Sequence, residues 1–351
     1  MKKTYLIIAA TALVALSACT KNEVRPASSD PQEITFQTVV GGVKTKAPGS
    51  QVTFNGDKFK SYAWFLPQGK TWAANYADAK RYISDAEISK NSEGKWKAAN
   101  AYYWPKQGSL TFFSWTLLAP AITNPAPAAF DKANVTCTAT KGIEVKDYDV
   151  SVNKNYDLMV ADIAADKTKN ENTYETDGVP TLFRHVLSNL AFTIATKDTY
   201  DGAEFVLTSI TLKNVNSKGT YTQGIDATKN ATEGVWSDGT QDQELPYISG
   251  GTVSFTKTPV QIDANGYNIV RPQTFGNDTP IIEIVYAIKT EYVSGAPVTE
   301  TVTVTKSLKS IFSDGWKAGK KYIMAITIGL DEILWDPAVE DWTEQGYDIT
   351  L

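Results

Sequence analysis

Short apolar runs recur along most of this chain, and polar residues with Gly, Asn, Asp and Pro separate them. Ile34, Phe36 and Val40 fall on one face of a predicted strand over residues 34–40, because strand side chains alternate between two faces. The later runs are rich in residues that suit half-buried strands and cover residues 62–66, 110–115, 156–161, 187–195, 205–212, 267–270, 281–288, 298–304 and 322–328. Short strands with regular turn signals are typical of β-sandwiches.

Few windows show the period of an amphipathic helix, and residues 73–83 are the best helical candidate. Residues 166–179 are polar, lack apolar periodicity and end before Pro180, which indicates an interdomain region. The pattern predicts an all-β protein with two tandem Greek-key or transthyretin-like β-sandwich domains, over residues 34–179 and 180–351. A chain of 351 residues is long enough for two domains.

The N-terminus has the order of features found in a secretory signal peptide, which we assign to residues 1–18. Lys2 and Lys3 precede an apolar run over residues 6–16, which is shorter than the roughly 20 residues of a membrane crossing. Cys19 follows a Leu-Ser-Ala triplet and so resembles the acylated cysteine of the bacterial lipobox. Acyl chains such as palmitate would anchor residues 19–33 as a flexible tether. The alternative is a plain secreted protein.

Cysteine content and charge limit the chemistry further. Cys137 is the only other cysteine, so acylation of Cys19 leaves no intramolecular disulfide, and we expect Cys137 to pack as a small hydrophobe. The formal net charge of −5 argues against nucleic acid as a partner, because a duplex is bound through a basic patch.

Candidate catalytic residues are few. His185 is the only histidine and stands at the start of an apolar strand, where a hydrogen-bonded structural histidine is the favoured interpretation. Asp336, Glu340 and Asp341 lie near two tryptophans, a combination that glycosidases use but that strand-end charges also explain. We therefore predict no enzyme activity, no cofactor and no metal.

Tryptophans could form a platform on which sugars stack, although core packing is the commoner role of aromatic residues in strands. The candidates are Trp64, Trp72, Trp96, Trp104 and Trp115.

Several motifs, taken in order, resemble the fimbrillin family, the type V pilus subunits of Gram-negative gut and oral anaerobes. After the lipobox come Ile-Thr-Phe at 34–36, Thr-Lys-Ala at 45–47, Tyr-Tyr-Trp-Pro at 102–105, the aromatic run at 110–115, the Phe-Arg-His strand at 182–190, Val-Arg-Pro-Gln at 270–273, Trp-Lys-Ala-Gly-Lys-Lys-Tyr at 316–322 and Val-Glu-Asp-Trp at 339–342. The last two segments carry the resemblance best.

The resemblance implies assembly by strand exchange. A fimbrillin reaches the outer membrane as a lipoprotein, and a protease then removes its N-terminal strand. Ile34, Phe36 and Val40 would be the plug, and cleavage would fall near Lys44 or Lys46. The family often has arginine at its processing site, so another protease would act here or the subunit would keep its anchor.

A neighbouring subunit's donor strand would then fill the groove, and the head-to-tail contact would build a fibre. The candidate donor lies within residues 333–351 and ends in alternating Tyr347, Ile349 and Leu351. The partners implied are other pilus subunits, the outer membrane and a ligand on a host or bacterial surface.

Three functions stay open at this point. The leading one is a structural, adhesive pilus subunit, with a stalk, tip or anchor role undecided. The second is a glycan-binding surface lipoprotein of a polysaccharide-uptake system, and the third is an anchored hydrolase that uses His185 or Asp336 and Asp341.

Overall fold

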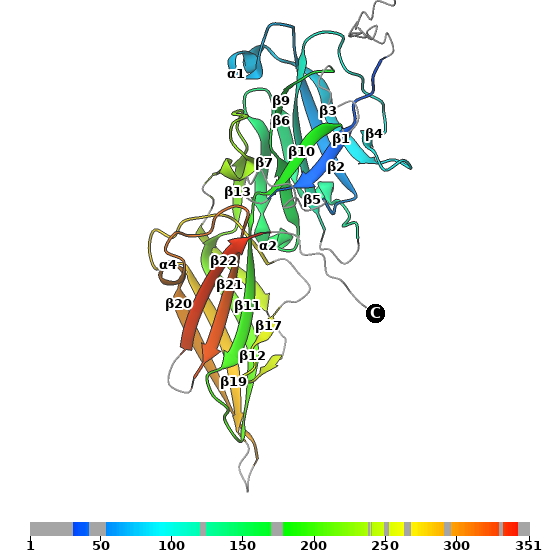
Figure 1. The fold of residues 1–351 in the computed structure, drawn as a ribbon. Helices are drawn as coiled ribbons and strands as arrows, with labels where there is room; N and C mark the ends of the chain where they lie inside the picture. The colour runs from blue at the N-terminus through cyan, green and yellow to red at the C-terminus, as the bar shows by residue number, and fades with distance from the viewer. Residues whose placement is uncertain are drawn as a thin grey trace, which may run out of the picture. The chain divides into compact units, whose positions relative to one another are not determined.

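In the described part of the chain β-strands dominate and form four sheets (Figure 1), which confirms the predicted all-β class. The computed structural model describes residues 31–41, 54–119, 124–169, 178–237, 239, 241–248, 253–262, 268–290, 296–329 and 333–342. Among these residues no helix has the length and apolar character of a membrane span.

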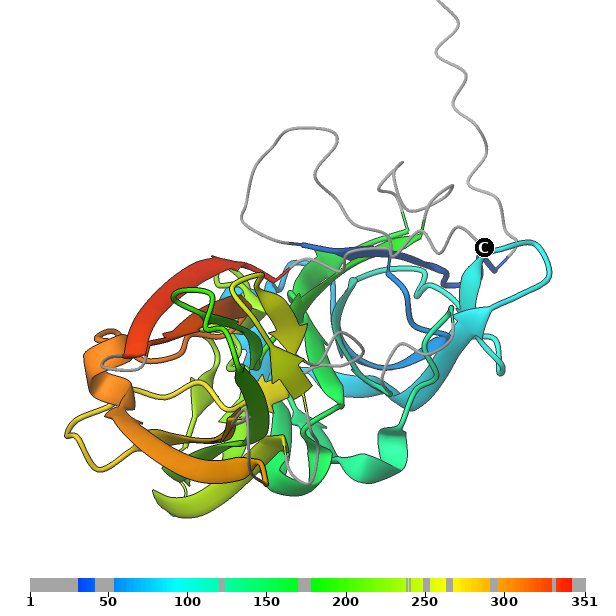
Figure 2. The same ribbon diagram turned by 90° about the horizontal axis from the view of Figure 1, so that it is seen from below.

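The first sheet closes on itself into a ring, because β5 pairs with β8 on one side and with β2 on the other. Figure 2 shows this ring from its end. The strands follow one another around it as β2 (Lys58–Leu66), β3 (Lys80–Lys90), β4 (Trp96–Ala98), β1 (Phe36–Val40), β10 (Val179–His185), β8 (Asp157–Ala161) and β5 (Ser109–Leu118), and β9 (Ala164–Lys167) also pairs with β5.

Strand β5 is buried along its whole length, because each of its faces packs against a core. Phe112 faces the core inside the ring, whereas Phe113 and Trp115 face a second core outside it. A sheet of four strands shares that outer core through Ile143 and Val145 of β7. It consists of β6 (Asn134–Thr138), β7 (Gly142–Asp149), β13 (Lys218–Thr222) and β14 (Val235–Trp236).

The two remaining sheets pack face to face, with Phe192 and Tyr247 in ring contact at 6.0 Å between centroids. One contains β11 (Ser188–Thr196), β17 (Val260–Ile262), β18 (Asn268–Val270), β21 (Lys320–Ile328) and β22 (Ile333–Asp341). The other contains β12 (Ala203–Asn216), β15 (Gln241–Ile248), β16 (Val253–Phe255), β19 (Ile281–Thr290) and β20 (Val298–Ser307).

The expected helix over residues 73–83 is wrong. A single turn, α1 (Trp72–Asn75), and a 3-10 turn, η1 (Tyr76–Asp78), precede β3, which begins at Lys80. Ile83 pairs with Ala63 of β2 and is buried in the ring, so sheet pairing overrides a weak helical pattern. The other helices among the described residues are also short: η2 (Phe130–Lys132), α2 (Val150–Asn153), η3 (Ala231–Glu233) and α4 (Leu308–Ile311).

Strand pairing crosses the expected domain boundary. That boundary, after Val179, falls inside β10, which belongs to the ring. Likewise β13 follows the boundary in sequence but pairs with β7, which precedes it. Residues Gln32 to Leu351 form one unit, and a division into two tandem domains stays a prediction.

Candidate functional site

The N-terminal strand β1 completes the ring and lies between β4 and β10. It runs parallel to β10 over its whole length, from Phe36 opposite Val179 to Val40 opposite Phe183. Its contact with β4 is a single antiparallel residue pair, Phe36 with Trp96. Removal of β1 would therefore leave the ring open between β4 and β10.

Backbone hydrogen bonds hold the segment around β1 from both sides. On one side, Ile34 N–H donates to the Tyr102 carbonyl at 2.7 Å, and Trp104 N–H donates to the Gln32 carbonyl at 2.9 Å. On the other side, Val179 N–H donates to the Thr35 carbonyl at 2.8 Å. The segment is thus an interior strand of a sheet and not a tether outside the fold.

The side chains of this segment fill the interior of the ring. Ile34, Phe36 and Val40 are 3%, 4% and 1% exposed. The Phe36 ring meets Phe59 at 5.5 Å and Phe112 at 5.7 Å between centroids, both nearly perpendicular. Aromatic pairs of this kind add stabilisation beyond the burial of their area. A cavity would remain if the strand were withdrawn.

Two residues that were not predicted as site residues shape the space that β1 occupies. Gly178 has a φ of +86°, and a Cβ there would lie 2.6 Å from the Phe36 backbone nitrogen, so only glycine permits the close approach. Arg184 donates to the Gly41 carbonyl at 3.2 Å and forms an ion pair with Asp162 at 2.9 Å. The sequence signals were a glycine placed just before a strand and the Phe-Arg-His motif that contains Arg184.

The other predicted functional residues lie outside the described part of the chain. These are the acylation site Cys19, the processing residues Lys44 and Lys46, and the donor residues Tyr347, Ile349 and Leu351.

Comparison with known proteins identifies the architecture. A family model described as fimbrillin-like matches residues 45–342. The chain belongs to the fimbrillin-like family. This confirms the resemblance seen in the sequence motifs.

Solved structures of other proteins are similar to this fimbrillin-like chain. A fimbrial protein from Bacteroides vulgatus ATCC 8482 is 16% identical, with a TM-score of 0.64 over 88% of this chain and 100% of that chain. A candidate cell adhesion protein from Bacteroides uniformis ATCC 8492 is 19% identical, with a TM-score of 0.48 over 89% and 98% of the two chains. The first likeness shows a shared fold. No curated protein matches the chain.

His185 of this fimbrillin-like chain is buried and hydrogen bonded. Its Nδ1 lies 3.0 Å from Asp157 Oδ1, and both residues are buried. The Trp342 ring lies parallel to the imidazole, with centroids 3.9 Å apart. This contact network agrees with a structural histidine that joins β8, β10 and the residue after β22.

The carboxylates considered for glycoside cleavage belong to strand β22. Asp336 and Glu340 pair in register with Ala325 and Lys321 of β21, and Asp341 forms an ion pair with Lys320. Among the described residues no group of three or more His, Cys, Asp or Glu is placed to hold a metal ion.

The tryptophans proposed as a sugar platform pack in the two cores. Trp64, Trp72, Trp96, Trp104 and Trp115 are all buried, so the face that stacking on a sugar needs is covered by protein. These five tryptophans therefore form no sugar-stacking platform, which was one of the two grounds for a glycan-binding lipoprotein beside the lipid anchor.

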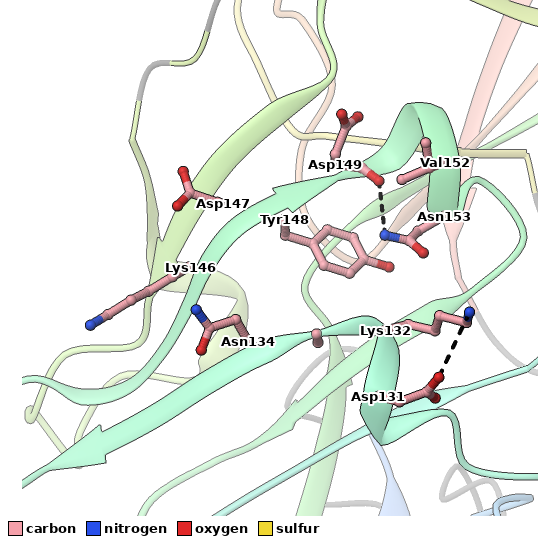
Figure 3. A pocket seen from close by; sticks show the side chains of 10 residues that line it. Asp131, Lys132, Asn134, Lys146, Asp147, Tyr148, Asp149, Val152 and Asn153 are labelled. Carbon is pink, nitrogen blue, oxygen red and sulfur yellow. Dashed lines mark hydrogen bonds and ion pairs between the residues drawn. The ribbon is translucent and has the colours of Figure 1, made fainter.

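The surface of the described part of this fimbrillin-like chain is hollowed at two places, among others. One, of about 350 Å³, is lined by charged and amide side chains around Tyr148 (Figure 3). Within it Lys132 pairs with Asp131 at 3.7 Å, and Asn153 donates to the Asp149 carbonyl at 3.0 Å. Some of the polar groups that line this concavity thus have hydrogen-bond or ion-pair partners within it.

The other concavity, of about 520 Å³, joins two motifs of the sequence analysis. Gln273 and Trp316 form an antiparallel bridge. Each backbone N–H donates to the other residue's carbonyl, at 3.0 and 2.8 Å. The Val-Arg-Pro-Gln and Trp-Lys-Ala-Gly segments thus meet in space and support each other's backbone. Their place in the fold gives them a structural role.

Proposed function

We propose that the chain is a structural and adhesive subunit of a cell-surface pilus that assembles by donor-strand exchange. In this proposal it is exported as a lipoprotein acylated at Cys19 and reaches the outer membrane before it joins a fimbrium. Membership of the fimbrillin-like family supports the pilus role. Ligands on host or bacterial surfaces are part of the proposal.

The observation that carries the proposal is the position of β1. This strand closes the ring, and its apolar side chains are buried inside. Only β10 pairs with it along its full length among the described strands. Its loss would expose an apolar groove with unpaired backbone groups on β10. Such an edge is a template for another chain's strand.

Release of β1 requires a cut after Gly41, the last described residue before Phe54. Lys44 and Lys46 lie in that interval, and we propose the cut at one of them. The groove would then accept the C-terminal segment of the next subunit, through the alternating side chains of Tyr347, Ile349 and Leu351. Each subunit would donate one strand and accept one, so the contact would propagate.

N-terminal sequencing of fibres sheared from the cell surface tests the proposal. We expect mature subunits to begin after Lys44 or Lys46. If all the protein begins at acylated Cys19 and none enters fibres, polymerisation is wrong and an anchor role is the one left.

A second experiment uses the purified protein. Limited trypsin digestion should cut after Lys44 or Lys46, and a peptide of residues 343–351 should then bind in place of β1. A Lys44→Gln/Lys46→Gln variant is the matched control, since it keeps β1 attached. A peptide with Ile349→Asp should bind far less, because a carboxylate would enter an apolar groove. Equal binding by both peptides would contradict donor exchange.

A further inference from the structure

Strand β20 presents a long, regular edge at the end of its sheet (Figure 1). All ten of its residues pair with β19, from Val298 opposite Thr290 to Ser307 opposite Ile281, without a register shift. No described strand pairs with its other side. By contrast β22, the edge of the facing sheet, carries Pro337, which cannot donate to a ladder.

The two faces of β20 differ in a regular way. The face toward the core carries half-buried Val302 and Val304, with Glu300 and Lys306 exposed beyond them. The outer face consists of exposed threonines at positions 299, 301, 303 and 305. Neither Glu300 nor Lys306 has an ion-pair partner within the described residues.

The order of these residues is symmetric about Thr303. Glu300 lies three positions before it and Lys306 three positions after it. In an antiparallel pair of identical strands centred on Thr303, Glu300 of each copy would therefore stand opposite Lys306 of the other. The same register places Val302 opposite Val304, Thr301 opposite Thr305, and Thr303 opposite itself.

We propose that β20 is a docking edge for a second copy of this chain, in a two-fold antiparallel pair centred on Thr303. Directly opposite residues lie on the same face of a sheet, so the two charge pairs and the two valine pairs all form together. A shift of the centre by one residue, to 302 or 304, places Glu300 opposite Val304 or Leu308 and loses both charge pairs. Charge complementarity therefore selects one register.

This contact is isologous, since the same surface is used by both copies. It differs from the head-to-tail contact of strand exchange, because it leaves β1 in place. Two subunits joined in this way would continue one sheet across the interface. The proposal does not rest on cleavage, so its failure would leave the pilus proposal intact.

Sedimentation of the purified, uncleaved protein over a range of concentrations tests the proposal. We expect a monomer–dimer equilibrium that high salt weakens, because exposed ion pairs are screened. Glu300→Lys places lysine opposite Lys306 twice, and Lys306→Glu places glutamate opposite Glu300 twice. Each single variant should dimerise about tenfold more weakly, as two attractive pairs become repulsive.

Combining the charges restores complementarity and makes the test specific. The double variant Glu300→Lys/Lys306→Glu should dimerise as the original does. A mixture of the two single variants should form a heterodimer, since both of its charge pairs are opposite in sign. Glu93→Lys and Lys229→Glu, at exposed positions in turns away from β20, are controls with the same change in net charge.

Two results would overturn the proposal. One is a protein that stays monomeric at every concentration. The other is a dimer that the single substitutions and the mixture leave unchanged, which would assign the contact to a different surface.

Discussion

Phe36 of β1 stands nearly perpendicular to Phe59 of β2, with ring centroids 5.5 Å apart and planes at 84°. The two residues lie on strands that are not neighbours in the ring, so their contact crosses its interior. This packing makes the N-terminal strand part of the core, although backbone pairing attaches it mainly to β10. In the proposed strand exchange, β1 would have to give up these core contacts as well as its pairing with β10.

Phe36→Ala should lower the free energy of unfolding by about 3–5 kcal/mol, because it leaves a cavity among Phe59 and Phe112. Denaturant unfolding of the purified protein measures the loss. Gln37→Ala is the control, since the side chain on the same strand is exposed, and it should change stability by less than about 0.5 kcal/mol. Similar losses for both would show that β1 does not pack as described.

Gly178→Ala should loosen β1 specifically. Alanine at a φ of +86° costs about 1–2 kcal/mol, and its Cβ would also press on the Phe36 backbone at 2.6 Å. Faster amide exchange in β1, measured by mass spectrometry, is the expected result.

Gly94→Ala separates the two effects of that substitution. Gly94 has a φ of +77° and no atom within 4 Å of its would-be Cβ, so it bears only the backbone cost. If amide exchange in β1 is equally slow in both variants, the close contact between Gly178 and the Phe36 backbone does not control how firmly β1 is held.

Cys137 should react slowly with alkylating reagents in the native protein. Burial raises its pKa to about 12, and the thiolate is the nucleophile. In a Cys19→Ser variant Cys137 is the only thiol, and its labelling by iodoacetamide at pH 8 should require denaturant. The rate should rise with pH as the thiolate fraction grows. Rapid native labelling at pH 8 would mean that the thiol is exposed.

Asp157→Ala should destabilise the protein by about 1–3 kcal/mol, because it removes the buried partner of His185. Thermal or denaturant unfolding gives the difference. Asp131→Ala is the matched control, with a side chain that is 78% exposed, and should have little effect. An unchanged stability for Asp157→Ala would exclude a structural role for the pair.

The strands themselves were largely readable from the sequence. The apolar runs at residues 110–115 and 281–288 correspond to β5 and β19, because β-branched and aromatic residues with turn signals act locally. The helix expected at residues 73–83 failed for the opposite reason. The conformation of the second half of this segment depends on pairing with β2, and the local sequence does not specify that partner.

The candidate site was readable only in part. The alternation of Ile34, Phe36 and Val40 marked an apolar face, but nothing in those residues named β10 and β4 as neighbours. Gly178 and Arg184 shape the space that β1 occupies through contacts with residues more than a hundred positions earlier in the chain. Such contacts arise from the fold and leave no local pattern.

By itself, the sequence determined the all-β class, the apolar face of the N-terminal segment and the motifs of the fimbrillin-like family. Only the tertiary structure decided that β1 closes a ring, that the five candidate tryptophans are buried, and that Glu300 and Lys306 lie on a strand edge that no other described strand pairs. The physical reason is that side-chain alternation is a local property of a strand. Which strands share hydrogen bonds, and which edge stays without a partner, follows from pairing between distant segments.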